Sequence, residues 1–272
     1  MQEKKDTPFF VGYLDMPAQL KKFYWPLGVL MMLFSLFMGY TLASAQKSSA
    51  SASWDTSEME TVTGFLQVKP YPVLHRVDPE NPGQTQSILL VEQGKFSADA
   101  AALPFHNKFV TIQGFSISHG GWSMLEITGG SDIQLMNESE TSRLEDFAEK
   151  LAPTSMGSVS LSGEIIDSKC YLGVMKPGEG TVHAACAEVC LLGGMPPMLV
   201  VRGHDNWRYG YILTHADGTS VSTDYAANAG QLQQVKGQLI RIGDLLYIQL
   251  QDGGSKVSLN DGVEPTILEA SS

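Results

Sequence analysis

The sequence lacks the short motifs that mark several large enzyme classes. It contains no G-x-S-x-G nucleophile elbow, no Gly-rich phosphate-binding loop and no H-E-x-x-H zinc helix. It also contains no C-x-x-C-H sequence for covalent attachment of haem. These absences argue against an α/β-hydrolase, a P-loop nucleotide hydrolase, a zincin protease and a c-type cytochrome.

Positive charge is also scarce. The 272-residue chain has 18 Lys and Arg against 29 Asp and Glu, a formal net charge of −11. Residues 46–272 carry 14 of the basic and 26 of the acidic side chains, so the deficit lies in this part. An acidic body repels phosphate backbones and anionic lipid headgroups, and we therefore expect no nucleic-acid partner.

Charge of either sign is absent from residues 23–45, "FYWPLGVLMMLFSLFMGYTLASA". A helix of about 20 apolar residues crosses the hydrocarbon core of a bilayer, so this segment predicts a transmembrane anchor. Lys21 and Lys22 precede it, and Trp25 stands where an interfacial aromatic belt lies. The bias of lysine toward the inner side then predicts that residues 1–22 are cytoplasmic and that the rest of the chain is exported.

A cleaved signal peptide is the alternative, because residues 43–45 form an Ala-Ser-Ala sequence like a small-residue processing site. Signal peptides have apolar cores of about 7–15 residues behind a short basic start. The uncharged core here is longer, and 22 residues precede it. This length favours a retained anchor, and either alternative exports the body of the protein.

The exported part divides into four stretches. Residues 46–58 are rich in Ser and Ala and have no apolar period, which predicts a flexible tether. Residues 59–137 and 158–272 contain alternating apolar positions, which predict two β domains. Between them, residues 138–157 predict a linker helix, with a Ser-x-x-Glu capping box followed by apolar residues at helical spacing.

The two β domains resemble each other. A weak internal repeat of this kind predicts two similar domains rather than a solenoid. The longest match has no gap and includes two shared glycines and several aligned aliphatic residues. The matched segments are Val110–Ile127 with Gln233–Leu250, Val62–Leu74 with Leu161–Gly173, and Ser87–Lys95 with Pro197–Asp205.

Short antiparallel strands with Gly at bends are typical of a five-stranded barrel of the oligonucleotide/oligosaccharide-binding (OB) kind. The predicted fold class is mainly β: one N-terminal transmembrane helix followed by two tandem OB-like small β-barrel domains with short helices. A small β-sandwich is the alternative. The cysteine region and residues 206–230 are interpreted as insertions in the second copy, and any chemistry is therefore expected in the second domain.

All three cysteines lie within 21 residues of one another. Residues 181–192 predict a short helix that a Gly-Gly pair ends. His183, Cys186 and Cys190 fall at i, i+3 and i+7, on one face of that helix. Cys170 ends the preceding strand, and a Pro-Gly turn in the intervening loop can bring it back. We expect these four side chains to converge as a Cys₃His set.

A Cys₃His set suits a zinc ion, which binds thiolates and imidazole in a tetrahedron. It also suits iron or an iron–sulfur cluster, and nearby methionines (Met175, Met195, Met198) allow copper. The expected cofactor is a metal ion, zinc or iron, or an iron–sulfur cluster. The other histidines are scattered and are predicted to be surface or turn residues: His75, His106, His119, His204 and His215.

A disulfide is the alternative, because exported cysteines commonly pair. Cys170 bonded to Cys186 or Cys190 would staple the loop and leave one thiol free, whereas the odd number of cysteines argues against this. A bridge from Cys186 to Cys190 is disfavoured, since Cβ atoms at i and i+4 lie farther apart than a disulfide allows. A third hypothesis is a thiol-redox enzyme, with Cys186 near the helix start as the better nucleophile.

The segments "GEIIDSKCYLGVM" and "HAACAEVCLLGGMPP" resemble a motif of exported bacterial proteins of uncharacterised function. In that group a Cys-Tyr or Cys-Phe pair and a His-x-x-Cys-Ala-x-x-Cys helix precede Gly-Gly-x-Pro on an OB-like domain. The match covers residues 163–201. It implies that the four Cys and His residues act as one unit and that the protein is in the bacterial envelope. Together with the predicted anchor and its orientation, this gives an expected location in the bacterial inner membrane, with periplasmic C-terminal domains.

The leading hypothesis is a membrane-anchored periplasmic accessory or electron-transfer subunit of a membrane-bound oxidoreductase or respiratory complex. Its expected partners are the bilayer and other subunits of that complex. An anchor and a ligand set without substrate machinery are more typical of a subunit than of an autonomous enzyme. The rival hypothesis is a scaffold or assembly protein whose cysteines only staple the loop.

Overall fold

The structure is a computed structural model of the chain. It contains two compact units, residues 1–50 and residues 51–272, which are described separately. The residues that it describes are 18–46, 52–137, 150–203, 208–251 and 257–258.

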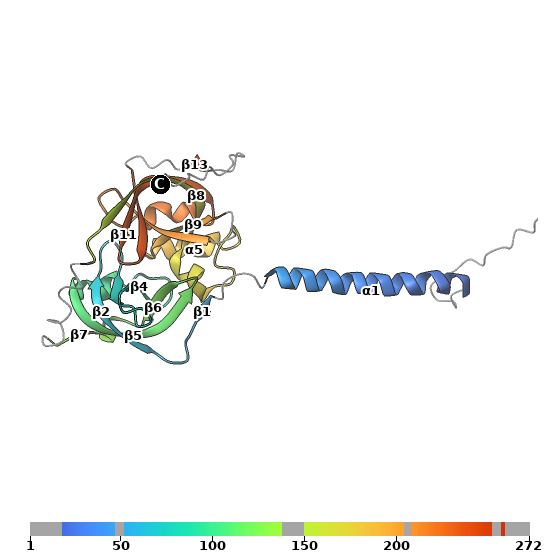
Figure 1. Ribbon diagram of the computed structural model, residues 1–272, viewed down its shortest axis with the longest axis horizontal. Helices are drawn as coiled ribbons and strands as arrows, with labels where there is room; N and C mark the ends of the chain where they lie inside the picture. Colours follow the sequence, from blue (N-terminus) through green and yellow to red (C-terminus); the bar gives the residue numbers. More distant parts are fainter. Residues whose placement is uncertain (1–17, 47–51, 138–149, 204–207, 252–256, 259–272) are drawn as a thin grey trace, which may run out of the picture. The chain divides into compact units, whose positions relative to one another are not determined.

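The first unit contains one long helix, α1 (Ala18–Gln46) (Figure 1). Its stretch Leu20–Ser44 is long and apolar enough to cross a membrane, and none of that stretch is buried in the protein. The uncharged run at residues 23–45 lies almost entirely within this stretch. A helix that is apolar all round and uncovered by protein matches the composition of a lipid-facing segment.

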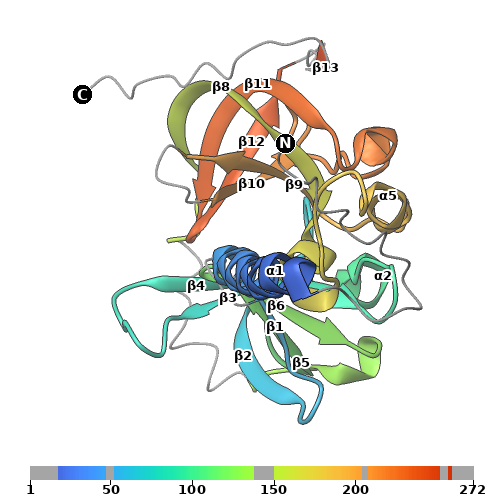
Figure 2. The ribbon, with the colours of Figure 1, turned by 90° about the vertical axis from the view of Figure 1, so that its right-hand side faces the viewer.

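The second unit is mainly β and contains two closed five-stranded barrels, one above the other in Figures 1 and 2. In each barrel the strands pair in the chain order 1-2-3-5-4-1, with strands 3 and 5 parallel and the other pairs antiparallel. This closure leaves no free edge, and it is the connectivity of an OB-like barrel. The predicted fold class is therefore confirmed.

The first barrel pairs in the order β2–β3–β4–β6–β5–β2. The second pairs in the order β8–β9–β10–β12–β11–β8. The barrel strands are β2 (Glu60–Gln67), β3 (Val73–Val77), β4 (Thr85–Glu92), β5 (Lys108–His119), β6 (Trp122–Ile127), β8 (Thr154–Asp167), β9 (Pro197–Arg202), β10 (Arg208–Thr214), β11 (Leu232–Ile242) and β12 (Leu245–Leu250).

Short elements complete the unit. Among the described residues, three add strand pairs at the margins of the barrels, and the others are short helices in the connections. They are β1 (Ser53–Trp54), α2 (Asp99–Ala102), η1 (Leu103–Phe105), η2 (Gly130–Asp132), β7 (Ile133–Leu135), η3 (Cys170–Val174), α5 (Ala184–Leu192), η4 (Thr223–Asn228) and β13 (Val257–Ser258).

The closing hairpins of the two barrels, β5–β6 and β11–β12, confirm the longest repeat match. Phe115 pairs with Glu126, and the residues aligned with them, Gln238 and Gln249, pair in the same way. The two hairpins therefore pair in the same register.

The shortest repeat match was wrong. Ser87–Lys95 covers β4, a third barrel strand, whereas Pro197–Asp205 covers β9, a second one. The true counterpart of β4 is β10, so residues 206–230 contribute a barrel strand and η4 and are no insertion. Both strand types are short and apolar, and hydrophobicity alone does not distinguish them.

Two segment boundaries also differ from the expectation. Ser53 and Trp54, placed in the tether by composition, form β1 and pair with β5. Most of the expected linker helix, residues 138–149, lies outside the described residues. The end of that range, from Thr154, belongs to β8. β8 is long because it pairs with β11 along almost the whole length of β11.

The two barrels share a hydrophobic core. Both contribute fully buried side chains to one cluster, which also contains two of the three cysteines. Tyr71 of the first barrel crosses this boundary, because its hydroxyl donates to the carbonyl oxygen of Leu213 and accepts from the N–H of Val221. The first barrel contributes Tyr71, Val73, Leu89, Val91, Ile117 and Met124, and the second contributes Ile166, Cys170, Tyr171, Leu172, Cys190, Met195, Met198, Val200, Ile212, Ile240, Leu245 and Tyr247.

His75 is fully buried, contrary to the prediction of a surface or turn residue. Its Nε2 lies 3.1 Å from Oε1 of Gln67 and its Nδ1 lies 2.8 Å from Oγ of Ser87. A carbonyl oxygen only accepts, so Nε2 carries the proton and Nδ1 accepts from the hydroxyl. Burial of this neutral imidazole lowers the pKa of His75 from 6.5 to about 4.

We expect His75 to make the protein less stable in mild acid. The unfolded chain takes up a proton near pH 6.5 and the folded chain only near pH 4, so stability falls as the pH drops through this window. Between pH 7 and pH 5 the expected loss is about 2 kcal/mol in the free energy of unfolding. Urea denaturation of the full-length protein in detergent at both pH values measures it.

The variant His75→Gln should lack most of this acid-dependent loss. The matched control is His215→Gln, which removes an exposed histidine and should keep the loss. An unchanged pH dependence in His75→Gln would show that other groups cause the effect.

Candidate metal centre

The connection between β8 and β9 carries all four predicted Cys and His ligands. β8 runs to Asp167, η3 begins at Cys170, and the loop after η3 returns the chain to α5. His183 is the N-cap residue of α5, and Cys186 and Cys190 follow one and two turns later. Gly178 permits this return, since a Cβ at that position would overlap the carbonyl oxygen of Cys170.

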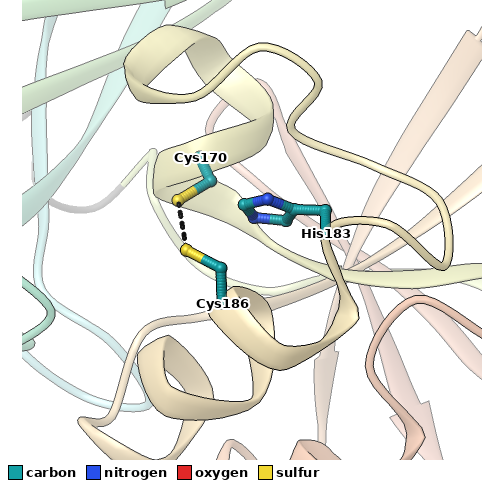
Figure 3. A group of neighbouring side chains, drawn as sticks. All are labelled: Cys170, His183 and Cys186. Carbon is teal, nitrogen blue, oxygen red and sulfur yellow. Dashed lines mark hydrogen bonds between the residues drawn. The ribbon is translucent and has the colours of Figure 1, made fainter.

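Three of the donors lie close together and largely out of solvent. The Sγ atoms of Cys170 and Cys186 and a ring nitrogen of His183 all lie within 4.8 Å of one another. The two sulfur atoms are 4.0 Å apart. Figure 3 shows the three side chains pointing toward one another from η3 and from the start of α5. Cys170 and His183 are buried, and Cys186 is half-buried.

Cys190 belongs to a second group of donors, which shares Cys170 with the first group. The Sγ atoms of Cys170 and Cys190 and a carboxylate oxygen of Asp167 form a second group within 4.8 Å, and all three residues are buried. The four predicted residues therefore occur as two overlapping groups that share Cys170. Their role as metal ligands stays a prediction.

Asp167 is a site residue that the sequence analysis missed. Its Oδ2 lies 3.1 Å from Nε2 of His183, and its Oδ1 accepts the backbone N–H of Cys170 at 2.9 Å. Because both oxygens have partners, Asp167 orients two of the donors. A carboxylate that holds the second nitrogen of a histidine is the usual outer partner of a metal-bound imidazole. The sequence signal that could have identified Asp167 was its position at the end of an apolar strand.

Lys95 is the second missed residue, and it comes from the first barrel. Its Nζ lies 2.7 Å from Sγ of Cys186, 3.1 Å from the carbonyl oxygen of Cys186 and 3.6 Å from Sγ of Cys190. The site was expected in the second domain alone, whereas the structure brings a residue of the first barrel into contact with its thiols. No local pattern around Lys95 marks it, because its partners are more than 90 residues away.

The thiols and Lys95 shift one another's protonation. A hydrogen bond shared with Cys190, together with burial, raises the pKa of Cys170. The same hydrogen bond and the charge of Lys95 lower the pKa of Cys190. Burial opposes the charge of Lys95, but the hydrogen bond to Cys186 and the three nearby sulfurs outweigh it and raise its pKa. Cys190, the thiol with the lowered pKa, is buried and poorly placed to attack a substrate.

A buried ion pair lies directly beside Cys170. Nζ of Lys169 is 2.7 Å from Oε1 of Glu126 in the first barrel, and the two side chains are 2% and 4% exposed. The same Nζ donates to the carbonyl oxygens of Glu92 and Gly94, and Oε2 of Glu126 accepts from Nε1 of Trp54. Lys169, which lies between the end of β8 and Cys170 at the start of η3, thus fastens this junction to the turn that carries Lys95.

The methionines proposed as copper ligands lie in different environments. Met195 and Met198 are fully buried in the core cluster that contains Cys170 and Cys190. Met175 is 45% exposed. Met195 and Met198 therefore belong to the same apolar core as these two thiols.

Comparison with known proteins yields no relative: no family model, no curated protein and no solved structure matches the chain. The functional assignment therefore depends on the chemistry of the donor set and its surroundings.

Proposed function

We propose that the protein is a membrane-anchored subunit that holds a metal centre in its exported part, through Cys170, His183, Cys186 and Cys190. The observation that carries this proposal is the largely buried group of two thiols and one imidazole within 4.8 Å, with the third thiol in a second group that shares Cys170. Donor atoms of a single metal ion have separations of this order, since zinc binds thiolates at about 2.3 Å and imidazole at about 2.0–2.1 Å.

The surroundings fit such a centre. With Nε2 of His183 held by Asp167, Nδ1 is the ring nitrogen left for a metal ion. Three thiolates and a divalent cation together carry one negative charge, and the ammonium of Lys95 neutralises it. The donors are the soft or borderline ligands that zinc, iron and iron–sulfur clusters prefer.

The role of the centre depends on the metal. Zinc would tie η3 to α5 as a structural crosslink, whereas iron or an iron–sulfur cluster would accept and release an electron. The donor set without substrate machinery supports an accessory or electron-transfer subunit of a membrane-bound oxidoreductase or respiratory complex. In this proposal α1 anchors the chain in the bacterial inner membrane and the barrels lie in the periplasm.

The test is the metal content of the full-length protein, purified anaerobically in detergent. We expect about one equivalent of zinc or iron by elemental analysis and its loss in Cys186→Ser, because the remaining donors no longer complete the set. His183→Ala should lose metal as well, while the matched variant His215→Ala, at an exposed histidine, should keep it. Metal-free wild-type protein, or full metal content in Cys186→Ser, would refute the proposal.

A disulfide-stapled scaffold is the second candidate, and the 4.0 Å between the sulfurs of Cys170 and Cys186 favours it. A disulfide bond is about 2.05 Å long, so small side-chain movements would bring the two atoms to bonding distance. This candidate predicts a single free thiol and a mass about 2 Da below that of the reduced chain. Thiol counting with and without reductant distinguishes it from a metal centre.

A further inference from the structure

We infer that Lys95 of the first barrel is a positioning residue of this centre: its ammonium holds two of the thiolate ligands and balances their charge. The inference rests on the proposed function and deepens it, since it makes the site a joint product of both barrels. The contacts that carry it are those from Nζ of Lys95 to Cys186 and Cys190.

The ammonium of Lys95 has a partner for each of its protons. A lysine has three N–H donors, and three acceptors surround this one: Sγ of Cys186, the carbonyl oxygen of Cys186 and Sγ of Cys190. Two of the three acceptors are proposed metal ligands. Hydrogen bonds to charged sulfur are stronger than those to neutral groups, so this arrangement fits thiolates better than thiols.

The backbone around Lys95 is fixed to the second barrel on both sides. Before it, the carbonyl oxygens of Glu92 and Gly94 accept from Nζ of the buried Lys169. After it, the N–H of Ser97 donates to the carbonyl oxygen of Gly193, just beyond α5. Because the turn is held at both ends, the Lys95 side chain loses little further conformational entropy when it contacts the thiols. Lys95 is therefore a preorganised outer partner of the site.

The charge of Lys95 matters most when metal is bound. Without this ammonium, a centre of three thiolates and a divalent cation would leave one negative charge in a largely buried site. Removing an outer partner of a metal site typically lowers metal affinity by about 10–100-fold. Loss of the N–H···S bonds also leaves more electron density on sulfur, which should shift thiolate-to-metal charge transfer to longer wavelength.

The experiment compares Lys95→Met, Lys95→Arg and Lys108→Met in the full-length protein in detergent. Co²⁺ is the probe, because its thiolate charge-transfer band reports the bound donors, and Zn²⁺ competition gives the affinity. Lys108→Met is the matched control, since Lys108 is an exposed lysine of the same barrel that bonds only to the carbonyl oxygen of Pro104 among the contacts described.

We expect Lys95→Met to bind metal about 10–100-fold more weakly, with its charge-transfer band at longer wavelength. Lys95→Arg should recover part of both properties because it keeps the charge, and Lys108→Met should match the wild type. Wild-type affinity and an unshifted band in Lys95→Met would overturn the inference while leaving the metal centre intact. Absence of Co²⁺ and Zn²⁺ binding in the wild type would instead overturn the proposed function.

Discussion

Replacing Lys169 with Met is expected to lower the free energy of unfolding by about 3–5 kcal/mol. Methionine fills nearly the same space, so the cost comes from charge and not from a cavity. Glu126 would keep only Nε1 of Trp54 among its described partners, and its carboxylate would be uncompensated in a site that is 4% exposed. The carbonyl oxygens of Glu92 and Gly94 would also lose their shared donor.

The double variant Lys169→Met/Glu126→Gln is the control for this prediction. It removes both charges, and since replacing a buried pair by neutral groups is often close to neutral, it should recover most of the lost stability. Urea denaturation in detergent, followed by tryptophan fluorescence, measures all three proteins. A loss below about 1 kcal/mol in Lys169→Met, the range of exposed ion pairs, would show that water reaches Glu126.

Truncating Leu89 to Ala is expected to lower the free energy of unfolding by about 2–5 kcal/mol and to loosen the contact between the barrels. Leu89 and its neighbour Leu90 are fully buried on β4 but point to opposite faces of the strand. Leu89 lies in the core that both barrels share, with Cys170 and Cys190, whereas Leu90 lies in the interior of the first barrel. Leu90→Ala is therefore a control with the same chemistry, burial and strand.

The rate at which the cysteines react with a thiol reagent separates the two variants. We expect metal-free Leu89→Ala to react faster than Leu90→Ala at equal global stability, because partial separation of the barrels exposes the thiols without unfolding either barrel. Stopped-flow measurement with a chromogenic disulfide reagent, alongside urea denaturation, tests this. Equal rates would indicate that the barrels open only by unfolding together.

The fold was accessible to sequence reasoning because the two hairpins repeat. The aligned segments around Gly114 and Gly237 share apolar positions with a period of two, and such a pattern sets the register of a strand. The alternating period is absent from β4 and β9, and for this reason the two strands were wrongly matched to each other. Strands buried on both faces are continuously apolar, and their place in the barrel is decided by pairing with distant strands.

The site was only half accessible for a related reason. His183, Cys186 and Cys190 lie on one helix, so their spacing predicts their common face. Lys95 contacts the thiols, and Glu126 contacts Lys169, because one barrel packs on the other, and such packing leaves no trace in local sequence. Asp167 lies between these cases, since its strand was recognised but the direction of its carboxylate depends on where α5 packs.

The apolar face between the barrels has a consequence for biogenesis. The ribosome makes the first barrel before the second, and Tyr71, Val73, Leu89 and Ile117 then have no covering partner. A first barrel without the second exposes an apolar surface, and such exposure favours aggregation during synthesis. The nascent chain consequently needs either rapid synthesis and folding of the second barrel or a chaperone that covers this surface until then.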